Sequence, residues 1–152
     1  MFDFIGLTGT VNHQLDEKSR VRIPSKFLPK EAQAKEDKSG LKFYFMAGSQ
    51  GCISVYTKEA LAGRLEKMRG NENNTLEVVE AKRKILASIE EVETDKQGRI
   101  VITANLRAVA KLIKDLVSIG VDDHFEIWAK EEYEKHDSNM SYDRAYSIVG
   151  FF

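Results

Sequence analysis

The chain has almost no cysteine for disulfide bonds and no long apolar segment for a membrane anchor. Cys52 is the only cysteine among 152 residues, which excludes an intrachain disulfide and fits a reducing cytoplasm. No segment approaches the roughly 18 consecutive apolar residues that a membrane span needs. The opening stretch MFDFIGLTGTV lacks the basic region of a signal peptide. We therefore expect a cytoplasmic protein with no membrane partner.

An excess of charge of one sign is also missing. The sequence has 23 Lys and Arg residues against 24 Asp and Glu residues, so its formal net charge is −1. This balance argues against a basic protein that coats polyanions without specificity, and it leaves only local patches for charged partners. A hydrophobic content of 42% and a charged content of 31% are typical of a soluble globular protein. The length predicts one compact domain or two small intertwined halves.

The sequence does contain an internal repeat. The stretch DEKSRVRIP at 16–24 returns as DKQGRIVIT at 95–103, so that Arg20 matches Arg99 and Val21 matches Ile100. A second pair follows in the same order, GCISVYTKEAL at 51–61 and DHFEIWAKEEY at 123–133. Repeated segments in a constant order indicate one structural unit used twice. We predict a first unit over residues 1–73 and a second over residues 74–152.

Each unit is expected to run strand, turn, strand, short helix and β-hairpin. Period-two alternation and turn residues predict strands at about 9–15, 20–24, 90–94 and 99–102, with hairpins that begin at Leu41 and Asp115. Thr103 is a suitable N-cap for a helix, and the residues expected on one of its faces are Leu106, Val109, Ala110 and Ile113. Tyr56 and Trp128 occupy equivalent strand ends and are expected in the core.

Two further helices are expected between the units. The first runs from Ala60 to Met68, and Thr75 opens the second. The residues of the second that we expect to face inward are Val78, Ala81, Ile85, Leu86 and Ile89. The chain looks helical from Lys130, and its last residues, SIVGFF, are expected to dock on the body or on a neighbour. Since four short strands per half leave many open edges, the two halves could close as a small barrel within a homo-oligomer.

The two turn motifs and the HFEIW–AKEEY ending resemble the MraZ family, a tandem duplication of the AbrB/SpoVT swapped-hairpin fold. The resemblance covers about residues 9–133. It implies an α+β, mainly β fold, a double-split β-barrel built from two half-barrels with helices packed around it. It also implies a nucleoid-associated transcriptional regulator. Such regulators form ring-shaped homo-oligomers and bind short repeats in double-stranded DNA upstream of the division and cell-wall gene cluster.

The resemblance places the DNA contacts on the turn with the motif Asp-x-Lys-Gly-Arg. The matching positions are Asp16, Lys18, Ser19 and Arg20 in the first half, and Asp95, Lys96, Gly98 and Arg99 in the second. Ser19 departs from the family's glycine. Either the first turn has a different shape, or the family's glycine does not need positive φ. Thr103 stands where the family commonly has proline, which should alter the start of the helix only.

Charge along the chain favours the first turn over the second. Residues 16–30 carry a local net charge of +3, which suits phosphate binding by Lys18, Arg20 and Arg22. Lys96 and Arg99 are expected to contribute less, because four acidic residues lie within 90–95. Asp16 and Asp95 are expected to cap their turns. The alternative is that the arginines are ordinary solvated residues at strand ends.

Other chemistry finds little support in the sequence. The spacing of His13, His124 and His136 matches no metal-ligand pattern, and the chain lacks a glycine-rich phosphate loop and a nucleophile elbow. Asp122, Asp123 and Glu126 fit the polar outer face of a hairpin better than a catalytic carboxylate pair. We expect no cofactor, no metal and no enzymatic activity. The alternative to a DNA-binding regulator is an oligomeric protein-interaction scaffold or an antitoxin-like partner binder.

Overall fold

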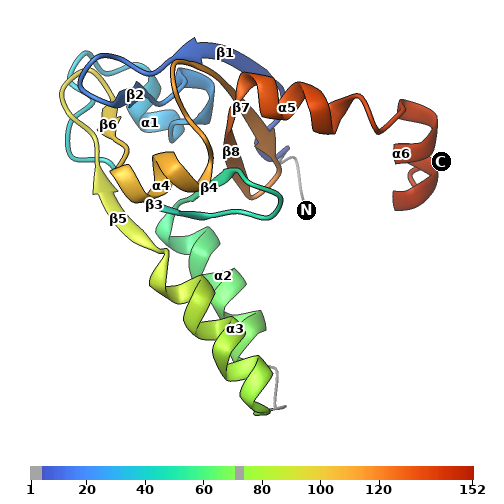
Figure 1. The fold of residues 1–152 in the computed structure, drawn as a ribbon. Helices are drawn as coiled ribbons and strands as arrows, with labels where there is room; N and C mark the ends of the chain where they lie inside the picture. Colours follow the sequence, from blue (N-terminus) through green and yellow to red (C-terminus); the bar gives the residue numbers. More distant parts are fainter. Residues whose placement is uncertain (1–4, 71–73) are drawn as a thin grey trace.

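The computed structural model describes residues 5–70 and 74–152. The fold contains both strands and helices. The strands are β1 (Thr10–Gln14), β2 (Arg20–Arg22), β3 (Lys42–Ala47), β4 (Ile53–Tyr56), β5 (Glu90–Glu93), β6 (Arg99–Val101), β7 (Asp115–Val121) and β8 (His124–Ala129). The helices are α1 (Lys30–Gln33), α2 (Lys58–Arg69), α3 (Leu76–Ala87), α4 (Ala104–Val109), α5 (Lys130–Asp137) and α6 (Tyr142–Val149), with a 3-10 turn at Ser25–Phe27. The predicted α+β, mainly β class is confirmed (Figure 1).

Six strands form one antiparallel sheet in the order β1-β7-β8-β4-β3-β5, and β2 pairs with β6 in a separate two-stranded ribbon. This order is symmetric: if β1, β3 and β4 of the first half are matched with β5, β7 and β8 of the second, the sheet has the same strand sequence from either edge. The first strand of each half pairs with the third strand of the other half, so β1 lies against β7 and β5 against β3. Neither half has a complete sheet of its own. Among the described residues, β1 and β5 are the open edges and no pairing closes the six strands into a ring.

The main core lies between the ribbon and one face of the large sheet. Alternation along the strands sends Val21 and Ile100 of the ribbon inward, together with Phe125 and Ile127 of β8. The ring of Phe27 stacks on Phe125 with centroids 4.8 Å apart. Because these residues come from both halves, the halves share this main core.

A smaller apolar cluster lies on the other face of the sheet. Trp128 packs there with Cys52 and Val117, and α5 covers it through Tyr133. Tyr56 is buried on this face as well and stacks on His124 at 4.8 Å between ring centroids. The prediction that the two aromatic residues are buried in the core is therefore confirmed, and both lie on the face of the sheet opposite the main cluster.

The helix after Thr103 begins as predicted and is shorter than expected. The Thr103 side chain accepts a hydrogen bond from the Leu106 amide, and Leu106 is buried. Lys111 has a φ of +56°, a left-handed conformation that follows the helix end at Val109. Ile113 therefore lies outside the helix and is 87% exposed, and Val109 is exposed too, so the prediction of a buried face is wrong for both.

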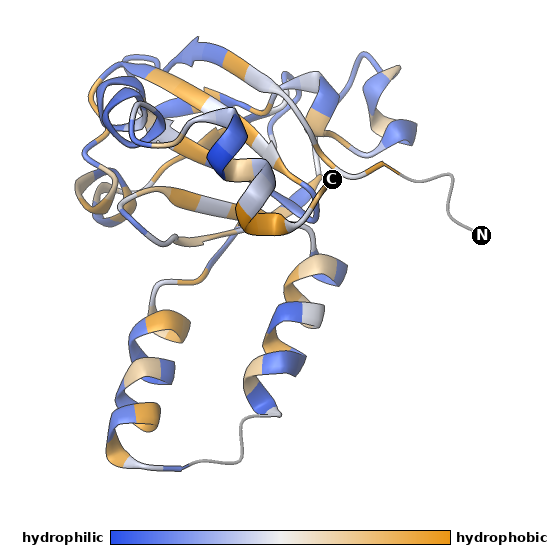
Figure 2. Ribbon diagram, turned by 90° about the vertical axis from the view of Figure 1, so that its right-hand side faces the viewer, coloured by the Kyte–Doolittle hydropathy of each residue, from blue (hydrophilic) through white to orange (hydrophobic). Residues whose placement is uncertain are grey.

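Helices α2 and α3 project from the body as a long hairpin (Figures 1 and 2). Leu61 of α2 is buried, whereas no residue of α3, which the structure describes completely, is buried. The predicted inward orientation of α3 is wrong for Ala81, Ile85 and Leu86, which are exposed. The apolar stripe exists, but no element within residues 5–70 and 74–152 buries it.

The C-terminal part forms two helices, α5 and α6. Helix α5 packs on β7 and β8, whereas α6 stands apart from the body (Figure 1) and none of its eight residues is buried. The C-terminal residues therefore do not dock on their own body. No helix within residues 5–70 and 74–152 has the length and apolar character that crossing a bilayer requires.

Gly120 provides a test of this strand arrangement. A Cβ atom there would lie 2.4 Å from the amide nitrogen of Thr8 and 2.6 Å from the carbonyl carbon of Leu7, and both are backbone atoms that cannot turn aside. We expect Gly120→Ala to lower the free energy of unfolding by about 1–3 kcal/mol in urea titrations. Gly63 in α2 has open space around it, so Gly63→Ala should instead raise stability by about 0.5–1 kcal/mol. Equal stability of the two variants would contradict the close approach at Gly120.

Candidate nucleic-acid interface

The first turn, between β1 and β2, is built around the carboxylate of Asp16. Its Oδ1 accepts hydrogen bonds from the amides of Lys18 and Arg20 at 2.9 and 2.8 Å. Its Oδ2 accepts one from the Arg20 Nε at 2.8 Å. One side chain thus holds both the backbone of the turn and the direction of the guanidinium, as expected for an Asx turn with a charge-assisted bond added.

The second turn, between β5 and β6, repeats this arrangement. Asp95 Oδ1 accepts from the amides of Gln97 and Arg99, each at 2.9 Å, and Oδ2 accepts from the Arg99 Nε at 2.8 Å. The predicted capping role of the two aspartates is confirmed. The exposed fractions of the arginine side chains agree as well, at 25% for Arg20 and 26% for Arg99.

Ser19 has a φ of +61° and the equivalent Gly98 has a φ of +75°. The first turn therefore keeps the shape of the second despite the substitution, which excludes a different shape for the first turn. Because both residues have a positive φ, the other alternative, that this position does not need positive φ, is excluded too. Serine carries a Cβ atom that makes left-handed backbone unfavourable, so Ser19 holds a modest strain that Gly98 does not.

Backbone hydrogen bonds join the two turns to each other. The Ile23 amide donates to the Gly98 carbonyl, and the Ile102 amide donates to the Ser19 carbonyl, both at 2.9 Å. Each turn is therefore held by the strand that follows the other turn. This exchange makes the ribbon and its two turns one rigid unit.

The exposed face of the ribbon carries three arginines. Val21 and Ile100 pair in the centre and point into the core, so their neighbours point the other way. Arg22 lies directly opposite Arg99, and Arg20 lies opposite Val101. Arg22 and Val101 are exposed. Like charges directly opposite each other across strands are destabilising, so the Arg22–Arg99 pair favours a site for an anion.

Asp16 and Asp95 place negative charge beside the arginines of the ribbon, and both carboxyl groups have a lowered pKa. Hydrogen bonds from the Arg20 backbone and guanidinium, with one from Lys18, lower the pKa of Asp16. At Asp95, partial desolvation alone would raise the pKa, but the hydrogen bonds from Arg99 and Gln97 outweigh it and lower the value. Of the three nitrogens of each guanidinium, only the Nε binds the aspartate. Within the described residues no other partner of the Arg20 or Arg99 side chain is found, which leaves the Nη groups for an external acceptor.

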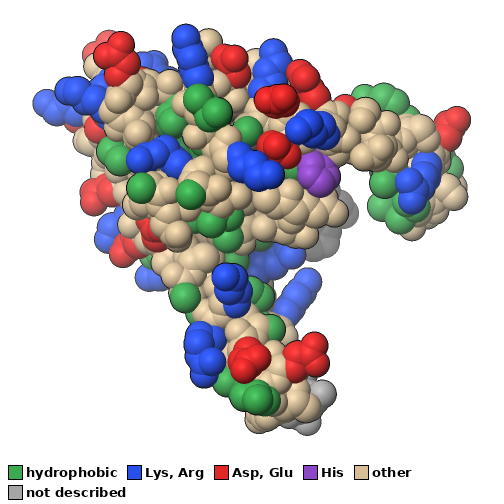
Figure 3. Space-filling model, viewed as in Figure 1, with side chains coloured by type: hydrophobic (Ala, Val, Ile, Leu, Met, Phe, Trp, Pro, Cys, Tyr) green, Lys and Arg blue, Asp and Glu red, His purple; other side chains and the backbone are tan. Residues whose placement is uncertain are grey.

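The structure brings all five predicted site residues to one end of the body. Lys18 and Lys96 are exposed in the two turns, next to the ribbon that carries the three arginines. In Figure 3, Lys and Arg side chains project from this end, interleaved with carboxylates. The proximity of the two turns was not evident from the sequence, which separates them by 79 residues.

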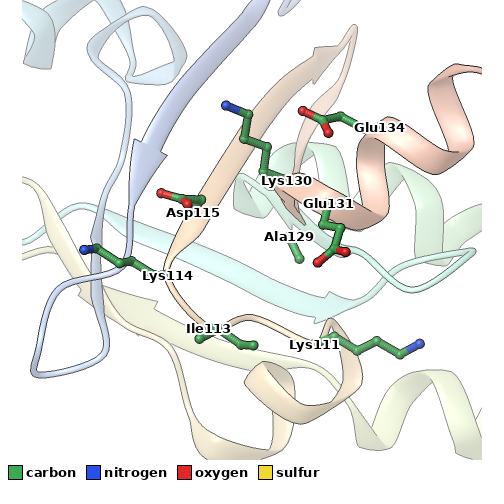
Figure 4. A pocket seen from close by; sticks show the side chains of 8 residues that line it. All are labelled: Lys111, Ile113, Lys114, Asp115, Ala129, Lys130, Glu131 and Glu134. Atoms are coloured by element: carbon green, nitrogen blue, oxygen red, sulfur yellow. The ribbon is translucent and has the colours of Figure 1, made fainter.

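Lys114 is a cation that the sequence analysis missed. Its carbonyl accepts a hydrogen bond from the Leu15 amide at 2.8 Å, which places it beside the first turn. It also lines a shallow pocket of about 480 Å³ between the start of β7 and α5, shown in Figure 4. Lysines alternate there with Asp115, Glu131 and Glu134, so the pocket has no excess of one charge. Only the pairing of Leu15 with Lys114 reveals that this residue belongs near the site.

A second polar cluster lies on the opposite face of the sheet. The Arg64 guanidinium donates to both oxygens of Asp123 at 2.9 and 3.1 Å, and Asp123 also bonds His124 at 2.8 Å. Burial alone would lower the pKa of His124, but contacts with Glu126 and Asp123 outweigh it and raise the value. The cluster joins α2 to the β7–β8 hairpin. The described residues contain no group of three His, Cys, Asp or Glu side chains that could hold a metal ion.

Exchanging the residues of the two turns tests the strain at Ser19. Because glycine tolerates left-handed φ, we expect Ser19→Gly to raise the free energy of unfolding by roughly 0.5–1 kcal/mol and Gly98→Ser to lower it by about 1 kcal/mol. Urea titrations of both variants measure this. A loss of stability in Ser19→Gly would contradict the conformation of the first turn.

Acid titration tests the two aspartates. Since their folded pKa values lie below the unfolded values, the stabilisation they provide is complete above about pH 4 and is lost as the pH falls through the folded values. We expect a variant with Asp16→Asn and Asp95→Asn to be less stable than the parent at pH 7 and to lose less stability between pH 5 and 2. Asp143→Asn, on exposed α6, is the matched control. Parallel pH profiles of parent and double variant would refute the assignment.

A family model and individual relatives of known name point to the same family. A family model described as "MraZ protein, putative antitoxin-like" matches residues 85–145. The chain is 38% identical to the Transcriptional regulator MraZ of Lachnoclostridium phytofermentans over 93% of its own length and 91% of the relative's. The proteins of the same name from Thermoanaerobacter sp. and Acetivibrio thermocellus are each 38% identical over 88% of this chain, covering 87% and 89% of their own lengths.

The similarity runs through both turns and nearly the whole fold described above. A chain that matches such relatives over about nine-tenths of its length and theirs is a homologue, as the sequence resemblance predicted. The protein belongs to the MraZ family.

Proposed function

We propose that this protein is a sequence-specific DNA-binding transcriptional regulator whose β2–β6 ribbon faces the duplex. The relatives that match it over most of its length are named transcriptional regulators. The function is binding and not catalysis, and it needs no cofactor. The protein acts in the cytoplasm, in association with the nucleoid.

The observation that carries this proposal is the Arg22–Arg99 pair on an exposed ribbon. Two arginines directly opposite each other destabilise a sheet unless an anion lies between or above them. A two-stranded ribbon also fits the major groove of B-DNA, and arginine is suited to both phosphate and guanine contacts. A phosphate backbone supplies the missing negative charge.

Each predicted residue then has its own part in the contact. Arg22 and Arg99 face each other at one end of the ribbon, and Arg20 lies on the same exposed face, two residues before Arg22. Lys18 and Lys96 extend the cationic surface at the two turns, where they neutralise phosphates without reading bases. Asp16 and Asp95 orient Arg20 and Arg99, which reduces the conformational entropy lost on binding.

The architecture proposed for this function is a double-split β-barrel made from two swapped-hairpin units, residues 1–73 and 74–152. The palindromic strand order and the matching turns support it. We also propose that several copies assemble into a ring that binds repeated sites upstream of the division and cell-wall gene cluster. Repeated sites let a ring engage several weak contacts at once, which multiplies the affinity.

An oligomeric scaffold or antitoxin-like partner binder is the second candidate. The exposed apolar residues of α3 and α6 favour contacts with protein. In that function the ribbon would contact an acidic protein surface and not a duplex. Only a binding experiment with DNA separates the two.

The test is a DNA-binding titration by fluorescence anisotropy, with a duplex selected by the protein from a randomised pool. We expect Arg22→Ala to weaken binding by roughly tenfold or more and to reduce the slope of log K against log salt by about 1, because one phosphate contact is lost. Arg20→Ala should weaken binding at least as much. Arg83→Ala on the polar side of α3 is the matched control and should bind as the parent does.

Two results would count against the proposal. If a variant with Arg20, Arg22 and Arg99 all changed to Ala selects and binds DNA like the parent, the ribbon is not the interface. If the parent protein selects no duplex even at low salt, the partner-binding function replaces the regulator.

A further inference from the structure

The outer face of the β2–β6 ribbon has four side-chain positions, and one of them is apolar. Arg20, Arg22 and Arg99 fill three positions, and Val101 fills the fourth. Val101 is 57% exposed, the largest exposed fraction of any large apolar residue in the eight strands. A single exposed valine is normal on a protein surface. The surroundings of this valine are unusual, because every other outward position of the ribbon carries a cation.

The internal repeat shows which position of the ribbon has changed. The offset of 79 residues that matches Arg20 with Arg99 also matches Arg22 with Val101. A fully symmetric ribbon would therefore carry four arginines. Instead, Arg22 lies opposite Arg99 at one end of the ribbon, and Arg20 lies opposite Val101 at the other. The two ends thus present different chemistry to a molecule that lies across the ribbon.

Arg20 and Val101 lie close together, and both side chains are restrained. The Ile102 amide donates to the Ser19 carbonyl at 2.9 Å. The next pair along the ladder, Arg20 and Val101, is therefore a non-hydrogen-bonded pair, in which facing side chains approach most closely. Asp16 binds the Arg20 guanidinium, and branching at Cβ leaves Val101 few rotamers. A cation and two methyl groups are presented side by side, with little freedom to lose on binding.

This combination of side chains matches the chemistry of the major groove. Base pairs differ there in their hydrogen-bonding groups and in one apolar group, the C5 methyl of thymine. Arginine suits guanine, and an apolar side chain suits the thymine methyl. Facing Cβ atoms of paired strands lie about 4.5–5.5 Å apart, and successive bases of one DNA strand are roughly 3.4 Å apart along the axis. Arg20 and Val101 can therefore reach bases that are one or two steps apart.

We propose that Val101 is a specificity-determining residue that reads the methyl group of a thymine, one or two base pairs from a guanine read by Arg20. This inference rests on the proposed function, in which the ribbon faces the duplex, and it names what one end of the ribbon recognises. The Arg22–Arg99 end has no apolar group for a thymine methyl. The ribbon therefore also distinguishes the two directions along its site.

Removal of the methyl group from the DNA tests the proposal without changing the protein. In the duplex that the parent protein selects from a randomised pool, each thymine is replaced in turn by deoxyuridine, and affinity is measured by fluorescence anisotropy. We expect one replacement to weaken binding by about threefold to fivefold, the scale of one buried methyl group, and the others to have little effect. Val101→Ser, which lacks both methyl groups, should bind the thymine and deoxyuridine forms of that duplex equally.

A change of side-chain chemistry provides the second test. Val101→Arg gives the ribbon its fourth arginine, and we expect a new selection from the pool to lose the thymine preference at that base pair and to keep the other preferred bases. Val121→Arg, at the end of β7 far from the first turn, is the matched control. It adds the same charge at another exposed strand valine and should select the site of the parent. Urea titrations verify that the variants fold.

Three results would overturn the role of Val101. The parent could bind every deoxyuridine duplex as tightly as the original, or Val101→Arg could select the same base as the parent at every position. A loss of affinity on deoxyuridine that persists in Val101→Ser would assign the methyl contact to another residue. A parent protein that selects no duplex at all would instead overturn the proposed function, before any variant of Val101 is made.

Discussion

The site depends on one repeated interaction, in which an aspartate carboxylate binds the arginine four residues later in the chain. Asp16 and Asp95 each accept two backbone amides and one guanidinium Nε. The backbone bonds set the shape of the turn, and the guanidinium bond sets the direction of the arginine. Without this brace, a long cationic side chain at a strand end would sample many rotamers and lose that freedom on binding.

The two aspartate–arginine turns are held in place by contacts between the two halves of the chain. The Ser19 and Gly98 carbonyls each accept an amide from the strand that follows the other turn, and β1 and β5 each pair with the other half. The main core contains residues of both halves. As a result, two turns that are distant in sequence form one rigid surface, and their positive charges add.

Outside this rigid body the chain presents helices that are not covered. Helix α3 and helix α6 have clear apolar faces, yet none of their residues is buried. Burial in the body and exposure on the projections divide the molecule into a part with its own core and two helices whose apolar faces no other described element of the chain covers. The ribbon and the projecting helices are thus separate surfaces of the molecule.

The sequence by itself determined the local features: the Asp-centred turns, the alternation of Val21 with Arg20 and Arg22, the Thr103 cap and the existence of two helices between the halves. These depend on neighbours a few residues apart. Tertiary structure decided that Arg22 lies opposite Arg99, that Lys114 lies beside the first turn, that Trp128 points away from the main core and that the apolar face of α3 is exposed. Strand register and burial depend on contacts between distant segments, and an apolar stripe predicts that a face will be covered but not which chain covers it.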